Sequence, residues 1–353
     1  MLRCLIFVAA LLAAASPAAC FTVHSVGPPA SALRRLISGR SRGLDGPKAL
    51  GGLNMQSEKP KAGMVKVPEG FVPPTPKPLS VTDNDILLPM FKALAGVTLR
   101  FATGIFASGW RPSYSLNDAP EGKYSLKLGP IYLSDTSKVP DFNRPSAPLV
   151  IYEYDGSPFC RKVREACSLL ALTVEFRPCP GARFGFAQEL QAKGGKMTVP
   201  YMEDPGAGVA MYESDDIINY LFDKYGPGAD KVPFTLKGTF AVVTCGIAAA
   251  LRGFPGGKVA AGARADNTQM QSIEMWGYEG SPFVALVRTK LVELCLPHRV
   301  VYVPRGAPGR DILAQRNAPT RFQVPYIEDP NTGVNMYESP DICKYLDDVY
   351  GSA

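Results

Sequence analysis

An internal repeat constrains this chain more than any other feature of its 353 residues. Residues 149–226 align with residues 273–351 almost without gaps: YEYDGSPFC matches WGYEGSPFV, and VPYMEDPGAGVAMYES matches VPYIEDPNTGVNMYES. The offset between the copies grows only from 124 residues at the start to 125 at the end. Solenoid repeats are about 20 to 50 residues long, so this period indicates two copies of a globular domain.

Both copies show the same order of predicted elements. The first contains a strand at 149–154, a helix that begins at Pro158, a strand at 173–177, a helix at 184–193, strands at 198–203 and 209–212, and a helix capped by Ser214. The order βαβ-α-ββα is that of the thioredoxin-like core. We therefore expect an α/β protein with two tandem thioredoxin-like domains, at 149–226 and 273–353, and additional helices in the N-terminal and inter-repeat segments.

The first 63 residues have the composition of a targeting leader. Residues 1–20 contain Arg3, an apolar run and a small-residue cleavage region, which is typical of a signal peptide. Residues 21–63 are rich in Arg and Ser and poor in acids, which is typical of a transit peptide. This series resembles the bipartite leaders of algae with secondary plastids and predicts the plastid stroma. The alternative is an ordinary secretory leader with a propeptide.

Two further segments lie outside the repeats. Residues 64–148 form an N-terminal extension with a predicted helix at about 86–107, whose apolar stripe is Met90, Leu94, Val97, Phe101 and Ile105. Residues 227–272 contain an uncharged run at 239–251, too short to cross a membrane, and a Gly- and Pro-rich linker. We expect no transmembrane span; both apolar stretches should pack on the repeats, with a peripheral membrane contact as the alternative.

Charge and composition exclude several classes of function. Of the net charge of +6, residues 1–56 carry +5, from six basic residues and Asp45, so the remaining chain is nearly neutral and nucleic-acid binding is not expected. His24 and His298 are the only histidines, which argues against a Ser-His-Asp triad or a multi-histidine metal site. The six cysteines after residue 20 form no CxxC pair, so neither a disulfide scaffold nor a metal site is predicted.

Three short motifs recur in both copies: Ser-Pro-Phe before the first helix, Val-Pro before the third strand, and Tyr-Glu-Ser before the last helix. With these motifs each copy resembles the N-terminal domain of glutathione S-transferases. The pairing of two in one chain resembles tandem thioredoxin-like proteins of plastids. The resemblance implies glutathione as a ligand or cosubstrate.

The resemblance implies a catalytic role for Ser157 and Ser281. Each lies between the first strand and the first helix, where free backbone amides and the helix dipole stabilise an anionic sulfur. In the related transferases this hydroxyl hydrogen-bonds the glutathione sulfur and lowers its pKa. The alternative is that both serines only cap their helices.

The Val-Pro motifs imply a backbone site for glutathione. By resemblance, Val199-Pro200 and Val324-Pro325 have cis peptide bonds, which are rare enough to be specific features. The backbone of Val199 and of Val324 would then pair with the cysteinyl part of glutathione. A proline that simply begins a strand is the alternative.

The Tyr-Glu-Ser motifs imply a site for the γ-glutamyl end of glutathione. By resemblance, the amides at the start of the last helix, with Ser214 and Ser339, suit its carboxylate, and Glu213 and Glu338 suit its ammonium group. A plain helix cap is the alternative for each copy.

Cys160 has two interpretations. It stands at the second cysteine position of a glutaredoxin Cys-Pro-Phe-Cys motif, so a monothiol role is one of them. However, it belongs to a stripe with three- and four-residue spacing, Cys160, Val163, Cys167 and Leu170, which indicates a buried helix face. Cys179 follows the second strand, so the two thiols are expected to be neighbours and could form a redox pair.

Two functions therefore stand side by side. The first is glutathione-dependent thiol chemistry in the plastid, either transferase-like with Ser157 or Ser281, or oxidoreductase-like with Cys160, acting on an unidentified electrophile or disulfide partner. The second is a non-catalytic glutathione-binding or interaction scaffold. Neither copy is followed by the helical domain that forms most of the electrophile pocket in soluble transferases, so the resemblance alone does not decide between them.

Overall fold

The computed structural model describes residues 65–76, 84–118, 123–128, 130–316 and 322–351. The predicted signal and transit segments, residues 1–63, lie outside this range.

Both repeats have the predicted βαβ-α-ββα order. The first consists of β4 (Leu149–Glu153), α4 (Pro158–Leu169), β5 (Thr173–Pro178), α5 (Ala187–Gly194), β6 (Tyr201–Asp204), β7 (Val209–Met211) and α6 (Ser214–Tyr225). The second consists of β8 (Ile273–Gly277), α8 (Pro282–Glu293), β9 (His298–Tyr302), α9 (Gly309–Arg316), β10 (Tyr326–Asp329), β11 (Val334–Met336) and α10 (Ser339–Tyr350). Helix α5 begins three residues later than expected, because Gly185 has a φ of 59° that interrupts helical geometry.

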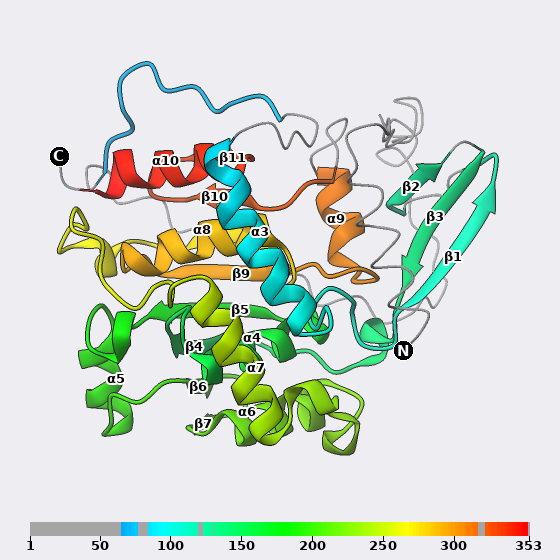
Figure 1. The fold of residues 1–353 in the computed structure, drawn as a ribbon, viewed down its shortest axis with the longest axis horizontal. Helices are drawn as coiled ribbons and strands as arrows, with labels where there is room; N and C mark the ends of the chain where they lie inside the picture. The colour runs from blue at the N-terminus through cyan, green and yellow to red at the C-terminus, as the bar shows by residue number, and fades with distance from the viewer. Residues whose placement is uncertain (1–64, 77–83, 119–122, 129, 317–321, 352–353) are drawn as a thin grey trace, which may run out of the picture.

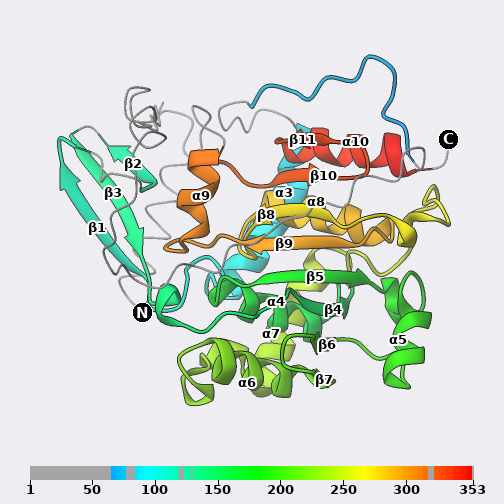
Figure 2. The ribbon, with the colours of Figure 1, turned by 180° about the vertical axis from the view of Figure 1, so that it is seen from behind.

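The two repeats share one eight-stranded sheet, which the sequence did not predict. Its strand order is β11-β10-β8-β9-β5-β4-β6-β7, and the repeats meet where β5 pairs antiparallel with β9 (Figures 1 and 2). Glu175 lies opposite Arg299 in this pairing, and these residues are equivalent at the offset of 124. A quasi-two-fold axis therefore passes between β5 and β9 and relates one repeat to the other.

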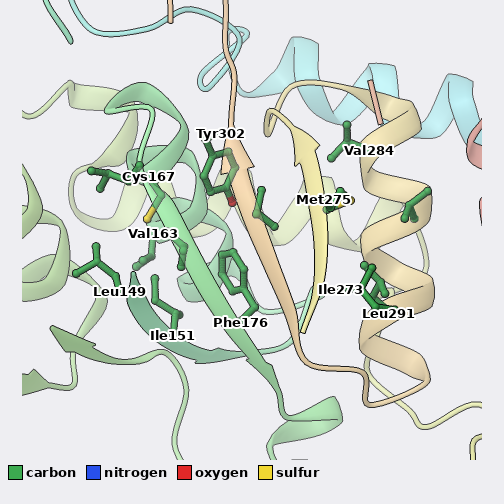
Figure 3. Close-up of a cluster of buried hydrophobic side chains, with 14 of the residues drawn as sticks. Leu149, Ile151, Val163, Cys167, Phe176, Ile273, Met275, Val284, Leu291 and Tyr302 are labelled. Atoms are coloured by element: carbon green, nitrogen blue, oxygen red, sulfur yellow. The ribbon is translucent and has the colours of Figure 1, made fainter. Parts of the chain in front are cut away.

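One hydrophobic core extends across both repeats. The helix faces expected to be buried are confirmed: Cys160, Val163, Cys167 and Leu170 on or next to α4, and Val284, Val287, Leu291 and Leu294 on or next to α8. Figure 3 shows side chains of the two repeats, among them Phe176 and Met275, gathered around the central strands. Because the core is continuous, the repeats are packed as one unit.

Two additional helices form an outer layer on one side of the sheet. Helices α3 (Asn84–Leu99) and α7 (Gly238–Leu251) lie in front of the sheet in Figure 1, pack against each other, and cover α8 and α4, respectively. The helix expected at about 86–107 instead ends at Leu99, because Phe101 and Ala102 adopt positive φ angles of 51° and 56°. Phe101, expected on a buried stripe, is exposed.

The quasi-symmetry also includes α3 and α7. Each helix ends at a leucine that is followed by an arginine. Four residues after the arginine lies a glycine with positive φ, Gly104 or Gly256. A Cβ at Gly104 would lie 3.0 Å from the Cβ of Glu279, and one at Gly256 would lie 3.2 Å from the Cβ of Asp155. Since Asp155 and Glu279 are equivalent, the loops after α3 and α7 make matching contacts with opposite repeats.

A small antiparallel sheet, also not predicted, precedes the first repeat. Strands β1 (Arg111–Leu116), β2 (Ser125–Leu128) and β3 (Ile131–Thr136) pair in the order β1-β3-β2 and extend from one side of the molecule in Figure 1. Within the described part of the chain, the structure contains no helix with the length and apolarity needed to cross a membrane.

Candidate functional site

The register of the sheet brings the three motifs of each repeat to one edge. In the first repeat Tyr152 lies opposite Tyr201, and Met202 lies opposite Met211. Extending this register by two residues places Val199-Pro200, before β6, beside Glu213, after β7. Both lie near the end of β4, where the chain turns into α4. The second repeat has the same arrangement, with Trp276 opposite Tyr326 and Ile327 opposite Met336.

Ser157 and Ser281 cap the helices that follow them. The Oγ of Ser157 accepts a hydrogen bond from the Cys160 amide at 3.3 Å, and the Oγ of Ser281 accepts one from the Val284 amide at 3.4 Å. Both residues are only 3% exposed. Both serines therefore cap their helices, and a capping oxygen can still donate its hydroxyl hydrogen to another acceptor.

The outer loops pack closely around both serine turns. A Cβ at Gly156 would lie 2.8 Å from the Pro255 carbonyl oxygen, and one at Gly280 would lie 2.1 Å from a side-chain carbon of Ile105. Only glycine leaves room for such an approach. The segments after α7 and α3 thus help to bury Ser157 and Ser281, respectively.

The two Val-Pro peptide bonds are cis, as the resemblance implied. Pro200 and Pro325 are buried, whereas Val199 and Val324 are partly exposed at the start of β6 and β10. The structure thus places both valines at the edge where the other two motifs lie.

The glutamates of the last motif adopt an unusual backbone conformation in both repeats. Glu213 has φ 64° and ψ 112°, and Glu338 has φ 70° and ψ 102°, at the N-caps of α6 and α10. Positive φ is rare for a residue with a Cβ, and such strain is concentrated at ligand-binding positions. Gln323 Nε2 donates a hydrogen bond to Glu338 at 2.9 Å.

Ser339 differs from Ser157 and Ser281 in its hydrogen bonding. It is 3% exposed, and its Oγ has no hydrogen-bond partner among the described residues. Buried hydroxyl groups are usually paired, because an unpaired one loses its bonds to water. Ser339 therefore presents an unused donor and acceptor at the start of α10.

A cavity of about 910 Å³ opens beside Ser339. It is lined by Lys92, the segments Arg252–Pro255 and 257–258, the α8 residues Leu286, Thr289, Lys290 and Glu293, and by Ser339, Pro340 and Cys343. Of the predicted site residues, Ser339 is the one that lines this cavity. The volume is within the range of small-molecule sites.

Comparison with known proteins identifies the repeats. Residues 151–229 and 275–353 each match the family described as glutathione S-transferase, N-terminal domain. The chain contains two glutathione S-transferase N-terminal domains. No curated protein and no solved structure matches the chain.

Cys160, in the first glutathione S-transferase N-terminal domain, has the environment of a core thiol. It is 1% exposed. Burial, followed by the neighbouring Glu153 carboxylate, raises its pKa to about 12, although hydrogen bonding to Ser157 and the charge of Arg164 oppose this. A thiolate is therefore disfavoured at neutral pH, which speaks for the core interpretation over the monothiol one.

Cys160 and Cys179 are both free thiols in this structure. Burial raises the pKa of Cys179, and the next cause is the nearby Cys160. Cys160 thus adds to the cost of ionising Cys179, which disfavours a thiolate at this position.

A buried ionic network joins the serine turns of the two domains, and sequence reasoning missed it. Arg164 lies 3.0 Å from Asp155 and 3.1 Å from Glu279, and Arg288 lies 3.0 Å and 2.7 Å from the same two carboxylates. Arg164 also pairs with Glu153. The acid two residues before each site serine and the arginine seven residues after it recur in both copies, and this repetition was the available signal.

This network controls the charge of Asp155. Burial by itself would raise the pKa of Asp155, but Arg288, Arg252 and Arg164 hold it well below its ordinary value. Asp155 stays ionised and fixes the turn that contains Ser157. Because Glu279 fixes the turn of Ser281 through the same arginines, the two sites are mechanically connected.

The last residues of β6 and β10, Asp204 and Asp329, stand where each hairpin turn begins and bind the last helix of their domain. Asp204 accepts hydrogen bonds from Tyr220 and Tyr225, and Asp329 accepts them from Tyr345 and Tyr350. Each carboxylate thereby ties its hairpin to the last helix of its domain. The described residues contain no group of three His, Cys, Asp or Glu side chains that could hold a metal ion.

Proposed function

We propose that this protein binds glutathione and that the second glutathione S-transferase N-terminal domain is the binding domain. The observation that supports this most is the buried, unpaired hydroxyl of Ser339, a residue that follows Glu338 in its strained conformation and lines the cavity beside α10. A ligand carboxylate at the start of α10 would satisfy this hydroxyl and the free helix amides together.

The charges around the cavity suit glutathione, which has two carboxylates and one ammonium group. Lys92, Lys258 and Lys290 line the cavity and can attract the carboxylates, while Glu293 is the one acid in the lining. Lys290 is already 2.8 Å from Asp347, so Lys92 and Lys258 are the more available cations.

The first domain is expected to bind glutathione more weakly. Its last helix, α6, has two acids in the first turn, Asp215 and Asp216, and Asp215 is bound to Lys162 at 2.7 Å. At the places of Lys162 and Asp215 the second domain has Leu286 and Pro340. Helix α10 has one acid in its first turn, Asp341, so an incoming carboxylate meets one more acid in the first domain than in the second.

We assign the thiol chemistry to Ser281. Its Oγ accepts the Val284 amide, so its hydrogen is free to donate to the sulfur of bound glutathione and to favour the thiolate. This is transferase-like activation rather than monothiol oxidoreduction, because burial raises the pKa of Cys160. For the first domain, the additional acid Asp215 in the first turn of α6 favours a non-catalytic, scaffolding role.

Calorimetric titration with glutathione tests the binding proposal. We expect Ser339→Ala to weaken binding about tenfold, since a hydrogen bond to a charged group contributes roughly 1.5–3 kcal/mol. The matched change Ser214→Ala in the first domain should alter it less than twofold. This assignment would be refuted if the wild-type chain did not bind glutathione, or if the two changes weakened binding equally.

The thiolate absorbance of bound glutathione tests the role of Ser281. Ser281→Ala should raise the pKa of the bound thiol and slow its reaction with an aryl halide, with little effect on binding. Ser157→Ala is the matched control. If neither change alters the thiol pKa, the scaffold function is the better description of both domains.

We propose the plastid as the compartment, on the composition of residues 1–63. A fluorescent protein fused behind these residues should enter the plastid of an alga with a secondary plastid. Removal of residues 21–63 from the fusion should divert it to secretion. Secretion of the complete fusion would instead support the secretory alternative.

A further inference from the structure

Helix α7 has its large side chains on the outside. The residues that face α3 and α4 are small, namely Ala241, Thr244, Cys245, Ala248 and Ala249. The outward residues are Phe240, Val243, Ile247 and Leu251, each between 42% and 51% exposed. A surface helix normally has polar residues on its solvent side. The outer face of α7 is instead apolar, as is typical of a helix face that packs against other apolar groups.

Neighbouring aromatic side chains enlarge this face. The rings of Phe101, Phe234 and Phe240 lie 5.7 to 6.2 Å apart, and Phe101 and Phe234 are more than half exposed. Phe254, just after α7, is also more than half exposed. We call this surface the α7 patch: Phe101, Phe234, Phe240, Val243, Ile247, Leu251 and Phe254. Contiguous exposed apolar surface of this kind marks an interaction site.

The segments that form the patch are basic and contain no acid. Residues 231–265 hold five Lys or Arg and no Asp or Glu, although Lys231 and Arg264 pair with the flanking Asp230 and Asp266; residues 86–117 hold three Lys or Arg and no acid. Among these cations Lys92, Lys237 and Lys258 are exposed, whereas Arg100 and Arg252 are engaged with Glu165 and Asp155 inside the protein. In a chain that is nearly neutral after its leader, this segregation gives the outer layer a positive charge.

We propose that the α7 patch binds the surface of an anionic lipid bilayer. Its apolar side chains would enter the boundary between headgroups and acyl chains, and Lys92, Lys237 and Lys258 would contact the phosphates. With 14 residues α7 is too short to span a bilayer of about 30 Å. It would therefore lie along the surface.

The charge distribution favours lipid over a second copy of the chain. Two copies joined through the α7 patch would bring their exposed lysines together with no acid from residues 86–117 or 231–265 to oppose them. The geometry is also suitable, because α3 and α7 are in front of the sheet in Figure 1 and behind it in Figure 2. The patch thus faces away from the core.

Flotation of the full chain with vesicles tests this proposal. We expect binding to vesicles that contain phosphatidylglycerol and at least tenfold weaker binding to vesicles of phosphatidylcholine alone. The double change Phe240→Ser and Ile247→Ser should weaken binding about tenfold. Its matched control is Tyr114→Ser with Leu116→Ser on β1, two residues that are 76% and 61% exposed and lie outside the patch; this control should bind as the wild type does.

A second pair of variants tests the charge. Lys237→Glu with Lys258→Glu should weaken binding to phosphatidylglycerol vesicles at least tenfold, and 0.5 M salt should do the same to the wild type. Lys196→Glu, an exposed position in the first domain, should leave binding unchanged.

Three outcomes would overturn the proposal. Equal binding to both kinds of vesicle would show that anionic lipid is not recognised. If Phe240→Ser with Ile247→Ser and Lys237→Glu with Lys258→Glu both bound vesicles as well as the wild type does, the contact would lie in another part of the chain, such as the leader. Sedimentation velocity that shows a dimer of the wild type, reduced to a monomer by Phe240→Ser with Ile247→Ser, would identify a second copy as the occupant.

Discussion

Glu175 and Arg299 occupy equivalent positions in the two repeats and face each other across the β5–β9 pairing, with Arg299 Nε 3.3 Å from a carboxylate oxygen of Glu175. In a symmetric pair of identical domains, a residue at this position would face its own copy. Two glutamates or two arginines would repel each other there. Because both domains are in one chain, the two positions can carry opposite charges, which favours pairing of one repeat with the other within the chain.

Arg299→Glu should therefore lower the free energy of unfolding by about 1 kcal/mol. The change replaces an attraction by a repulsion, and its size is limited because the Arg299 side chain is 34% exposed. Adding Glu175→Arg should recover part of the loss. Urea denaturation of the two single variants and the double variant measures this coupling, and strictly additive effects would show that the pair does not interact.

Arg164→Met should cost roughly 3–5 kcal/mol, because it leaves the buried Glu153 without a partner and removes one of the arginines that bind Asp155 and Glu279. Arg316→Met removes a single, more exposed ion pair with Glu328 and should cost less than about 1 kcal/mol. The same urea experiment measures both. Similar losses in the two variants would mean that the network is solvated rather than buried.

The pH dependence of stability should report His298. Burial lowers its pKa to about 4, so the folded protein keeps the imidazole neutral while the unfolded chain takes up a proton below about pH 6.5. Its contribution to stability is present above this pH and is lost as the pH falls towards 4, by about 3 kcal/mol in total. His298→Val, which introduces the residue found at the equivalent Val174, should flatten the curve over this range.

The comparison with the wild type isolates His298 from the carboxyl groups that titrate in the same range. Identical pH slopes for the two proteins would show that the imidazole is already accessible to water in the folded state.

Cysteine reactivity should follow burial. With Cys4 and Cys20 changed to Ser, Cys343 should react first with a thiol reagent at pH 8, because it is the partly exposed thiol among the described cysteines. Cys160 and Cys167 should react only as the protein unfolds, since both side chains are buried. Mass spectrometry of timed samples gives the order. Faster labelling of Cys160 than of Cys343 would restore the monothiol interpretation.

Local patterns in the sequence were reliable guides to the repeats. The spacing of Cys160, Val163 and Cys167 predicted the buried face of α4, and the Ser-Pro motifs predicted where α4 and α8 begin. These signals work because helix periodicity and capping depend on residues only a few positions apart. The same reasoning extended the N-terminal helix too far, since apolar spacing continued past Arg100 although Phe101 turns out of the helix.

For the site, the motifs located the serines, the valines and the glutamates, but not their surroundings. Nothing local indicated that Ile105 would pack on the Ser281 turn, or that Arg164 of the first domain would bind Glu279 of the second. The burial of the unpaired Ser339 hydroxyl was equally invisible, because the motif does not show which groups pack around it. Such differences arise from packing between distant segments.

The sequence by itself determined that this protein has two thioredoxin-like domains of one family, with their helices, hairpins and motif positions. Tertiary structure decided that the domains share one sheet through β5 and β9, that α3 and α7 cover them, and that the Ser339 hydroxyl is buried without a partner. The physical reason is range. Periodicity and capping are encoded within a few residues, whereas the pairing of Glu175 with Arg299 joins positions 124 residues apart and depends on how whole surfaces fit together.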